Sequence, residues 1–79
     1  MLDRLNKINL LYDIYAPLLT ERQREILHLY FSDNYSLGEI AADFNISRQA
    51  VHDLIRRTIG ILDRLEEKMK LYEQFNARQ

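Results

Sequence analysis

The sequence contains no cysteine, which excludes disulfide bridges and zinc sites built from thiolates. A chain without cysteine fits the reducing cytoplasm, where we expect this protein to act. Only two glycines and one proline interrupt 79 residues dominated by helix-forming side chains, so the sequence predicts an all-α fold. The net charge is only -1, so any contact with nucleic acid requires a local basic patch in place of an overall positive field.

A long apolar run is also missing. The apolar opening MLDRLNKINLLYDIYAPLL is interrupted by charged residues, which argues against a signal peptide or a membrane span: Asp3, Arg4, Lys7 and Asp13. A chain of 79 residues suffices for one domain with a small core. We therefore expect a single domain over residues 1–79, of the kind that often depends on a partner for stability.

Apolar spacing and helix-capping residues predict four helices. The first covers about residues 2–15 and ends before Pro17, and one face of it carries Leu5, Ile8, Tyr12 and Tyr15. The second begins after Thr20, where TERQ forms a capping box, and SDNYS ends it. The third begins at Ser36 in a second capping box, SLGE. The fourth begins after Ser47 and meets no stop signal before the tail, so we expect it to continue through Tyr72.

The third and fourth helices are predicted to form a helix-turn-helix, the hairpin unit of residues 36–58. Their two caps lie eleven residues apart, and Asn45 between them tolerates the left-handed conformation that a helix end needs. Ile46 would fill the turn, and the other apolar residues of the unit are Ile40, Ala41, Phe44, Val51 and Leu54. A plain helical hairpin would show the same apolar residues and is the alternative.

Polar residues at the start of the fourth helix fall in one arc at about 100° per residue: Arg48, Gln49, His52, Asp53 and Arg56. Arginine and glutamine carry the donors that read guanine and adenine edges, while Ser47 and Arg57 could hold phosphates. The predicted nucleic-acid-binding residues are therefore Ser47, Arg48, Gln49, His52, Arg56 and Arg57. Asp53 would repel phosphate unless it accepts from a cytosine amine or pairs with Arg56 or Arg57. A solvated polar face is the alternative interpretation.

Residues 59–75 continue the fourth helix with a heptad-like apolar stripe, which comprises Leu62, Leu65, Met69 and Tyr72. Such a stripe must be covered, because four exposed large apolar residues would promote aggregation. It could pack on the first helix within one chain. Pairing with a second copy is the favoured alternative, because a homodimer would also space two recognition helices for successive turns of the major groove. Gly60 within this helix marks either a kink or a close approach of another backbone.

The sequence lacks the patterns expected of an enzyme or a metal protein. His28 and His52 lie on different predicted helices and lack metal-ligand spacing, and no glycine-rich phosphate loop is present. Glu66 and Glu67 are adjacent, so they point in different directions and are expected to be solvated surface residues. We expect no catalytic activity, no metal and no cofactor.

The segment LTERQREILHLYFSDNYSLGEIAADFNISRQAVHDLIRRT, with the opening INLLYDIYAPLL and the ending YEQF, resembles the YlxM family of small bacterial DNA-binding proteins. The resemblance extends from about Asn6 to Phe75. Within it, SLGEIAADFNISRQAV is also similar to the helix-turn-helix with which sigma factors contact promoters. In sigma factors an arginine and usually a glutamate that touch bases match Arg48 and Gln49. Here Gln49 replaces the acid, and Asp53 stands where a polar or basic residue is usual.

The YlxM resemblance implies a non-catalytic regulatory protein that assists the signal recognition particle pathway. The implied partners are DNA, signal recognition particle RNA or a signal recognition particle protein. Family members usually continue beyond the point where this chain stops. A second hypothesis is a protein–protein adapter that kept the helix-turn-helix fold without binding nucleic acid. The near-zero net charge favours the adapter, and the arginine and glutamine arc favours nucleic-acid binding.

Overall fold

The computed structural model describes residues 2–77, except for the side chains of residues 2–5 and 76. Five α-helices follow one another along the chain: α1 (Leu2–Tyr15), α2 (Glu21–Leu27), α3 (Leu37–Phe44), α4 (Arg48–Met69) and α5 (Leu71–Ala77). A 3-10 turn, η1 (Ala16–Leu18), follows α1, and a π-helical turn, η2 (His28–Ser32), extends α2. The all-α prediction is confirmed.

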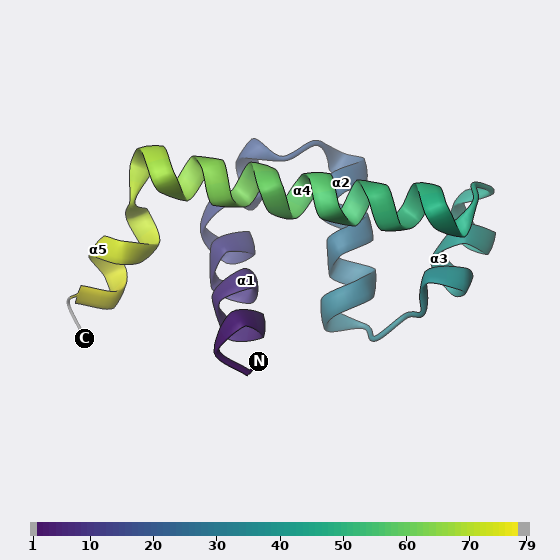
Figure 1. Ribbon diagram of the computed structural model, residues 1–79, viewed down its shortest axis with the longest axis horizontal. Coiled ribbons are helices and arrows are strands. Elements are labelled where there is room, and N and C mark those ends of the chain that lie inside the picture. The colour runs from purple at the N-terminus through teal and green to yellow at the C-terminus, as the bar shows by residue number, and fades with distance from the viewer. Residues whose placement is uncertain (1, 78–79) are drawn as a thin grey trace.

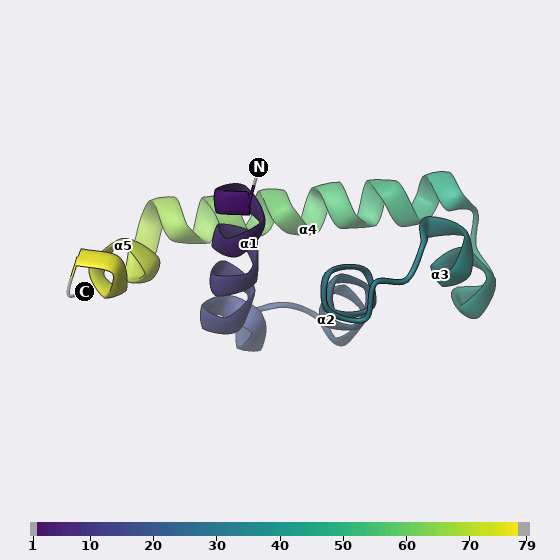
Figure 2. The ribbon, with the colours of Figure 1, turned by 90° about the horizontal axis from the view of Figure 1, so that it is seen from below.

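α4 is the longest element, with 22 residues, and the other helices are arranged along it (Figure 1). α1 and α2 cross it steeply and extend from the same side of it, whereas α3 lies beside its N-terminal end and α5 beside its C-terminal end (Figures 1 and 2). The described molecule measures 42 × 23 × 17 Å. Because α4 spans the molecule, it connects the helix-turn-helix at one end with the C-terminal helix at the other.

Both predicted capping boxes are present. The Thr20 hydroxyl accepts from the Gln23 amide at 3.1 Å, and the Gln23 side chain accepts from the Thr20 amide at 2.9 Å. Ser36 and Glu39 make the same two bonds at 3.1 and 2.9 Å. Each box satisfies two amides that the first turn of a helix leaves without partners. These four side chains therefore fix where α2 and α3 begin.

The turn between α3 and α4 also follows the prediction. Asn45 adopts the left-handed conformation, with φ of 55°, and the Ile46 amide donates to the Ala41 carbonyl at 3.1 Å. Ser47 then caps α4 by accepting from the Ala50 amide at 3.0 Å. An asparagine can hold this backbone at modest cost, because its short polar side chain tolerates positive φ. Residues 37–69 thus form a short helix, a tight turn and a long helix.

The hydrophobic core lies beneath α4, where side chains of α1, α2 and α3 meet it. Its fully buried members include Leu11 and Tyr15 of α1, Ile26 and Leu27 of α2, and Ile40, Val51 and Leu62. Ile8 and Tyr15 are buried and Tyr12 is half-buried, as expected of the inward face of α1, while the Leu5 side chain lies outside the described residues. The only buried polar residue in the described part, Thr58, donates its hydroxyl to the Leu54 carbonyl at 2.7 Å.

The prediction that the fourth helix continues through Tyr72 is wrong. α4 ends at Met69, Lys70 adopts the left-handed conformation with φ of 55°, and α5 begins at Leu71. The Glu66 carboxylate accepts from the amides of Tyr72 at 3.0 Å and Glu73 at 2.9 Å, and it therefore caps the first turn of α5. It also accepts from the Tyr15 hydroxyl at 2.7 Å, which attaches the break to α1.

Candidate nucleic-acid interface

The helix-turn-helix presents the polar face of α4 to solvent. Val51 is fully buried and Ile55 and Thr58 are nearly so, which fixes the rotation of α4 about its own axis. Every residue predicted to contact nucleic acid is exposed: Ser47 at the N-cap of α4, and Arg48, Gln49, His52, Arg56 and Arg57 on its first three turns. We call this set, together with the half-buried Asp53, the polar arc.

Arg48 lies across the first turn of α3. Its Cδ and Nε atoms are each 4.0 Å from the position that a β-carbon on Gly38 would occupy. Arg48, Gln49 and His52 of α4, with Leu37 of α3, line a shallow groove of about 370 Å³. The two helices therefore share one concave surface at the corner of the helix-turn-helix.

Asp53 contacts Gln49 and His52, and not Arg56 or Arg57. Its Oδ1 atom accepts from Gln49 Nε2 at 3.1 Å and lies 4.0 Å from His52 Nδ1. Residues four apart on a helix are neighbours on its surface, so this bond follows from the spacing of Gln49 and Asp53. The spacing of four residues is thus the signal in the sequence that indicates this bond.

The charge of the polar arc is locally basic. Three arginines stand against the single carboxylate of Asp53, whereas the chain as a whole has a net charge of -1. α3 is acidic, with Glu39 and Asp43, and the Glu39 carboxylate accepts from the Ser36 amide in the capping box. Positive charge is thus concentrated on the first three turns of α4.

The apolar stripe near the C-terminus divides between buried and exposed side chains. Leu62 is fully buried within the chain, and Leu65 and Tyr72 are half-buried. The Lys7 amine lies 5.7 Å from the centre of the Tyr72 ring, which is within the range of a cation–π contact. Met69 is 44% exposed. α1 and α5 therefore cover much of the stripe in a single chain.

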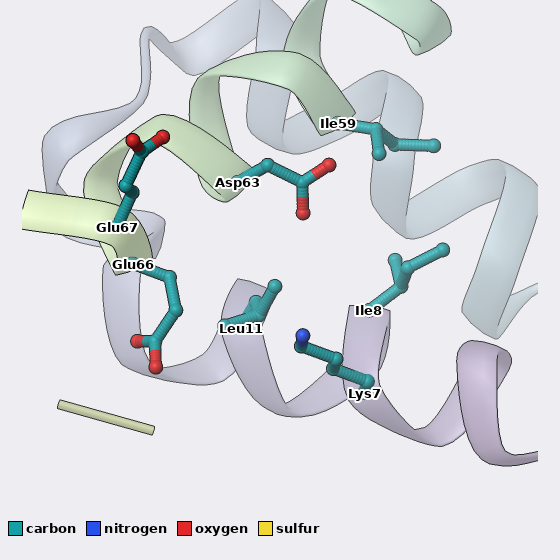
Figure 3. A pocket seen from close by; sticks show the side chains of 7 residues that line it. All are labelled: Lys7, Ile8, Leu11, Ile59, Asp63, Glu66 and Glu67. Carbon is teal, nitrogen blue, oxygen red and sulfur yellow. The ribbon is translucent and has the colours of Figure 1, made fainter. Parts of the chain in front are cut away.

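A pocket of about 440 Å³ opens between α1 and α4, away from the polar arc (Figure 3). Its floor consists of Ile8, Leu11 and Ile59, and its rim carries Lys7, Asp63, Glu66 and Glu67. The Lys7 amine and the Asp63 carboxylate point toward one another across the opening (Figure 3). The rim is acidic, since three residues with a carboxylate and one residue with an amine line it.

The expectation that Glu66 is a solvated surface residue is wrong, whereas Glu67 is exposed as expected. Burial alone would raise the pKa of Glu66, but hydrogen bonds from Tyr15, Tyr72 and Glu73 and the nearby charge of Lys7 hold it below its usual value. Burial raises the pKa of the Tyr15 hydroxyl, and its hydrogen bond to Glu66 adds to the effect, although the Leu71 amide acts in the opposite direction. The lowered pKa favours an ionised Glu66 carboxylate and the raised pKa favours a protonated Tyr15 hydroxyl, as the hydrogen bond from Tyr15 to Glu66 requires.

No group of three or more histidine, cysteine, aspartate or glutamate side chains in the described part of the chain is arranged to hold a metal ion. No helix among those residues combines the length and the apolar character needed to cross a bilayer.

Comparison with known proteins identifies the family of the chain. Residues 2–79 match UPF0122, described as "Putative helix-turn-helix protein, YlxM / p13 like". A UPF0122 protein of Limosilactobacillus fermentum is 52% identical over 77 residues, which cover 98% of this chain and 68% of the relative. A relative from an Exiguobacterium species is 51% identical over 78 residues, which cover 99% of this chain and 73% of the relative. One from Bacillus cereus is 48% identical over 79 residues, or 100% of this chain and 72% of the relative. The chain therefore belongs to the UPF0122 family of YlxM- and p13-like helix-turn-helix proteins.

Proposed function

We propose that this chain is a non-catalytic regulatory protein that binds nucleic acid with the polar arc of α4. The observation that carries the proposal is the concentration of three exposed arginines and Gln49 on the first three turns of α4, whose apolar face is anchored in the core. A helix held in this way can enter a groove without rotating, which is how the second helix of a helix-turn-helix meets DNA.

The arc offers two kinds of contact. Arg48, beside the first turn of α3, and Arg56 and Arg57 can bind phosphate oxygens, which position a protein on its target. Gln49 and His52 carry amide and imidazole groups that can reach base edges. Duplex DNA and signal recognition particle RNA are the proposed targets, the second because of the YlxM resemblance.

Salt dependence provides the quantitative test. Each phosphate contact releases counterions and lowers the logarithm of the duplex-DNA affinity by about 0.9 per tenfold rise in salt. Three arginine contacts therefore predict a loss of roughly 40-fold between about 50 and 200 mM salt. An Arg48→Ala, Arg56→Ala variant retains one contact, so its loss should be only about 3- to 4-fold.

The measurement is a titration of labelled duplex DNA and of signal recognition particle RNA by fluorescence anisotropy at both salt concentrations. An Arg64→Ala, Lys68→Ala variant is the matched control, because it removes the same charge from the C-terminal half of α4. It should retain the salt dependence of the parent protein. If both variants showed the same reduced dependence of affinity on salt, the net charge of the protein, and not the polar arc, would govern binding.

The pocket between α1 and α4 favours a second candidate function, a protein–protein adapter. An apolar floor beneath an acidic rim suits a lysine or arginine side chain, whose stem is apolar and whose head is cationic. A signal recognition particle protein is the partner that the YlxM resemblance suggests. Absence of nucleic-acid binding at low salt, together with binding of a basic protein that Asp63→Asn and Glu67→Gln weaken, would favour the adapter.

We also propose that two copies of the chain associate through the exposed apolar side chains around the end of α4. Met69 and Leu71 are 44% and 39% exposed and flank the break at Lys70, while Phe75 is 49% exposed one turn further along α5. Sedimentation of a Met69→Glu variant tests this, since its side chain is exposed and its replacement leaves the core intact. A parent protein that sediments as a monomer would exclude the homodimer.

A further inference from the structure

We propose that Asp53 determines which bases the polar arc accepts, because it fixes the orientation of the Gln49 side chain. The inference rests on the nucleic-acid-binding function proposed above and concerns duplex DNA read in the major groove. Its basis is the hydrogen bond of 3.1 Å from Gln49 Nε2 to Asp53 Oδ1.

The chemistry of the two side chains sets the orientation of the amide. An ionised carboxylate only accepts hydrogen bonds, so Gln49 must turn its nitrogen toward Asp53 and its oxygen away. The Asp53 side chain is 43% exposed, so its carboxylate can reach a base from the same surface as Gln49. The surface that faces the groove then consists of the Gln49 Oε1 atom and the unused lone pairs of Asp53.

An isolated glutamine would present a donor and an acceptor side by side and could turn to suit several bases. The Gln49–Asp53 pair presents mainly acceptors in one fixed arrangement. In the major groove, only adenine N6 and cytosine N4 offer amino donors, whereas guanine O6 and thymine O4 are acceptors. The pair should therefore select a base that bears an amino group and reject guanine and thymine at the position it contacts.

Two simpler roles for Asp53 make different predictions. If the Gln49–Asp53 hydrogen bond only stabilised the helix, its removal would leave the base preference unchanged. A carboxylate that acts only through its charge would weaken binding to every sequence equally, because phosphates surround all base pairs. Base preference is thus the readout that separates a positioning role from both alternatives.

The experiment selects binding sites from a randomised duplex with the whole protein at low salt and then measures affinities for the four bases at the selected position. The variants are Gln49→Ala, Asp53→Asn and, as the control, Asp43→Asn. Asp43 is an exposed carboxylate on α3, so its replacement removes the same charge from the helix-turn-helix without removing the hydrogen bond to Gln49. Circular dichroism verifies that each variant is folded.

The parent protein should favour adenine or cytosine over guanine and thymine by about 5- to 100-fold, the range of one well-made base contact. Asp53→Asn should bind random duplex more tightly and reduce that ratio to within about threefold, because an asparagine amide can either donate or accept. Gln49→Ala should also abolish the preference for adenine or cytosine. Asp43→Asn should raise affinity for all sequences and leave the ratio intact.

Three results would overturn the inference. They are a preference of the parent protein for guanine or thymine at that position, salt-dependent binding without any base preference, and an Asp53→Asn variant that keeps the parent ratio. Each of these leaves nucleic-acid binding itself in place. Absence of any binding by the parent protein at low salt would instead overturn the proposed function, and the inference with it.

Discussion

Replacement of Glu66 by glutamine should release α5 from the rest of the protein. The carboxylate of Glu66 accepts three hydrogen bonds, from the Tyr15 hydroxyl and from the amides of Tyr72 and Glu73. A glutamine keeps one acceptor oxygen and places an NH₂ group where the other oxygen faces a donor. Hydrogen bonds to a charged acceptor contribute about 1.5–3 kcal/mol each, so Glu66→Gln should lose at least one such contribution.

The expected loss of about 1.5–3 kcal/mol falls mainly on the docking of α5, because two of the three donors to Glu66 are amides of α5, whereas the third donor, Tyr15, is held in the core by its buried ring. Amide hydrogen exchange measured by NMR reports this local opening. The amides of Tyr72 and Glu73 should exchange about 10- to 100-fold faster in the variant, since each 1.4 kcal/mol is a tenfold change. Amides in the middle of α4 should change much less.

Glu67→Gln is the matched control, because it makes the same chemical change one residue further along, at an exposed side chain with no hydrogen bond to α5 among the described residues. It should leave exchange in α5 unchanged. Equal acceleration by the two variants, or none by Glu66→Gln, would refute the assignment of Glu66 as the cap of α5.

The lowered pKa of Glu66 adds a pH dependence to the same prediction. A carboxyl group whose pKa is lower in the folded state stabilises that state above its usual pKa of 4.5. This stabilisation is lost as the pH falls through the lowered value. Protection of the α5 amides in the parent protein should therefore decline in acid, whereas Glu66→Gln should not show this transition.

Three other substitutions test the fold, each by urea denaturation at neutral pH. Leu62→Ala should reduce the free energy of unfolding by about 2–5 kcal/mol, because the side chain is fully buried; a loss below 1 kcal/mol would contradict its place in the core. Ser36→Ala removes the hydroxyl that accepts from the Glu39 amide and should cost about 1 kcal/mol; an unchanged stability would mean that the box is not formed in solution. Gly60→Ala should stabilise the protein by up to about 1 kcal/mol, since the added methyl would meet only Arg64 Nη1 at 3.6 Å; destabilisation would indicate a close neighbour at Gly60.

The features that could be predicted from the sequence are those that depend on nearby residues. Each capping box joins the side chain of one residue to the backbone amide of another three positions away, and the Asn45 turn depends on one residue that tolerates positive φ. The rotation of α4 followed from the spacing of its apolar residues, so the exposure of Arg48 and Arg56 could be predicted as well.

The end of α4 could not be predicted in the same way. The stripe through Leu65, Met69 and Tyr72 keeps its heptad-like spacing across Lys70, and the sequence offers no glycine or proline there. The break is stabilised by Tyr15 and Glu66, which are 51 residues apart in the chain. A contact between residues so far apart in the sequence depends on how α1 packs against α4, and the local spacing of residues does not predict that packing.

The uninterrupted course of α4 has a mechanical consequence. Gln49 and Glu66 lie on the same helix, seventeen residues apart, which corresponds to roughly 25 Å at about 1.5 Å per residue. A stiff rod of this kind transmits tilt and rotation from one end to the other with little bending. Two macromolecules held at its opposite ends would be kept at a constant separation and orientation, so the protein would act on their geometry as a spacer of defined length.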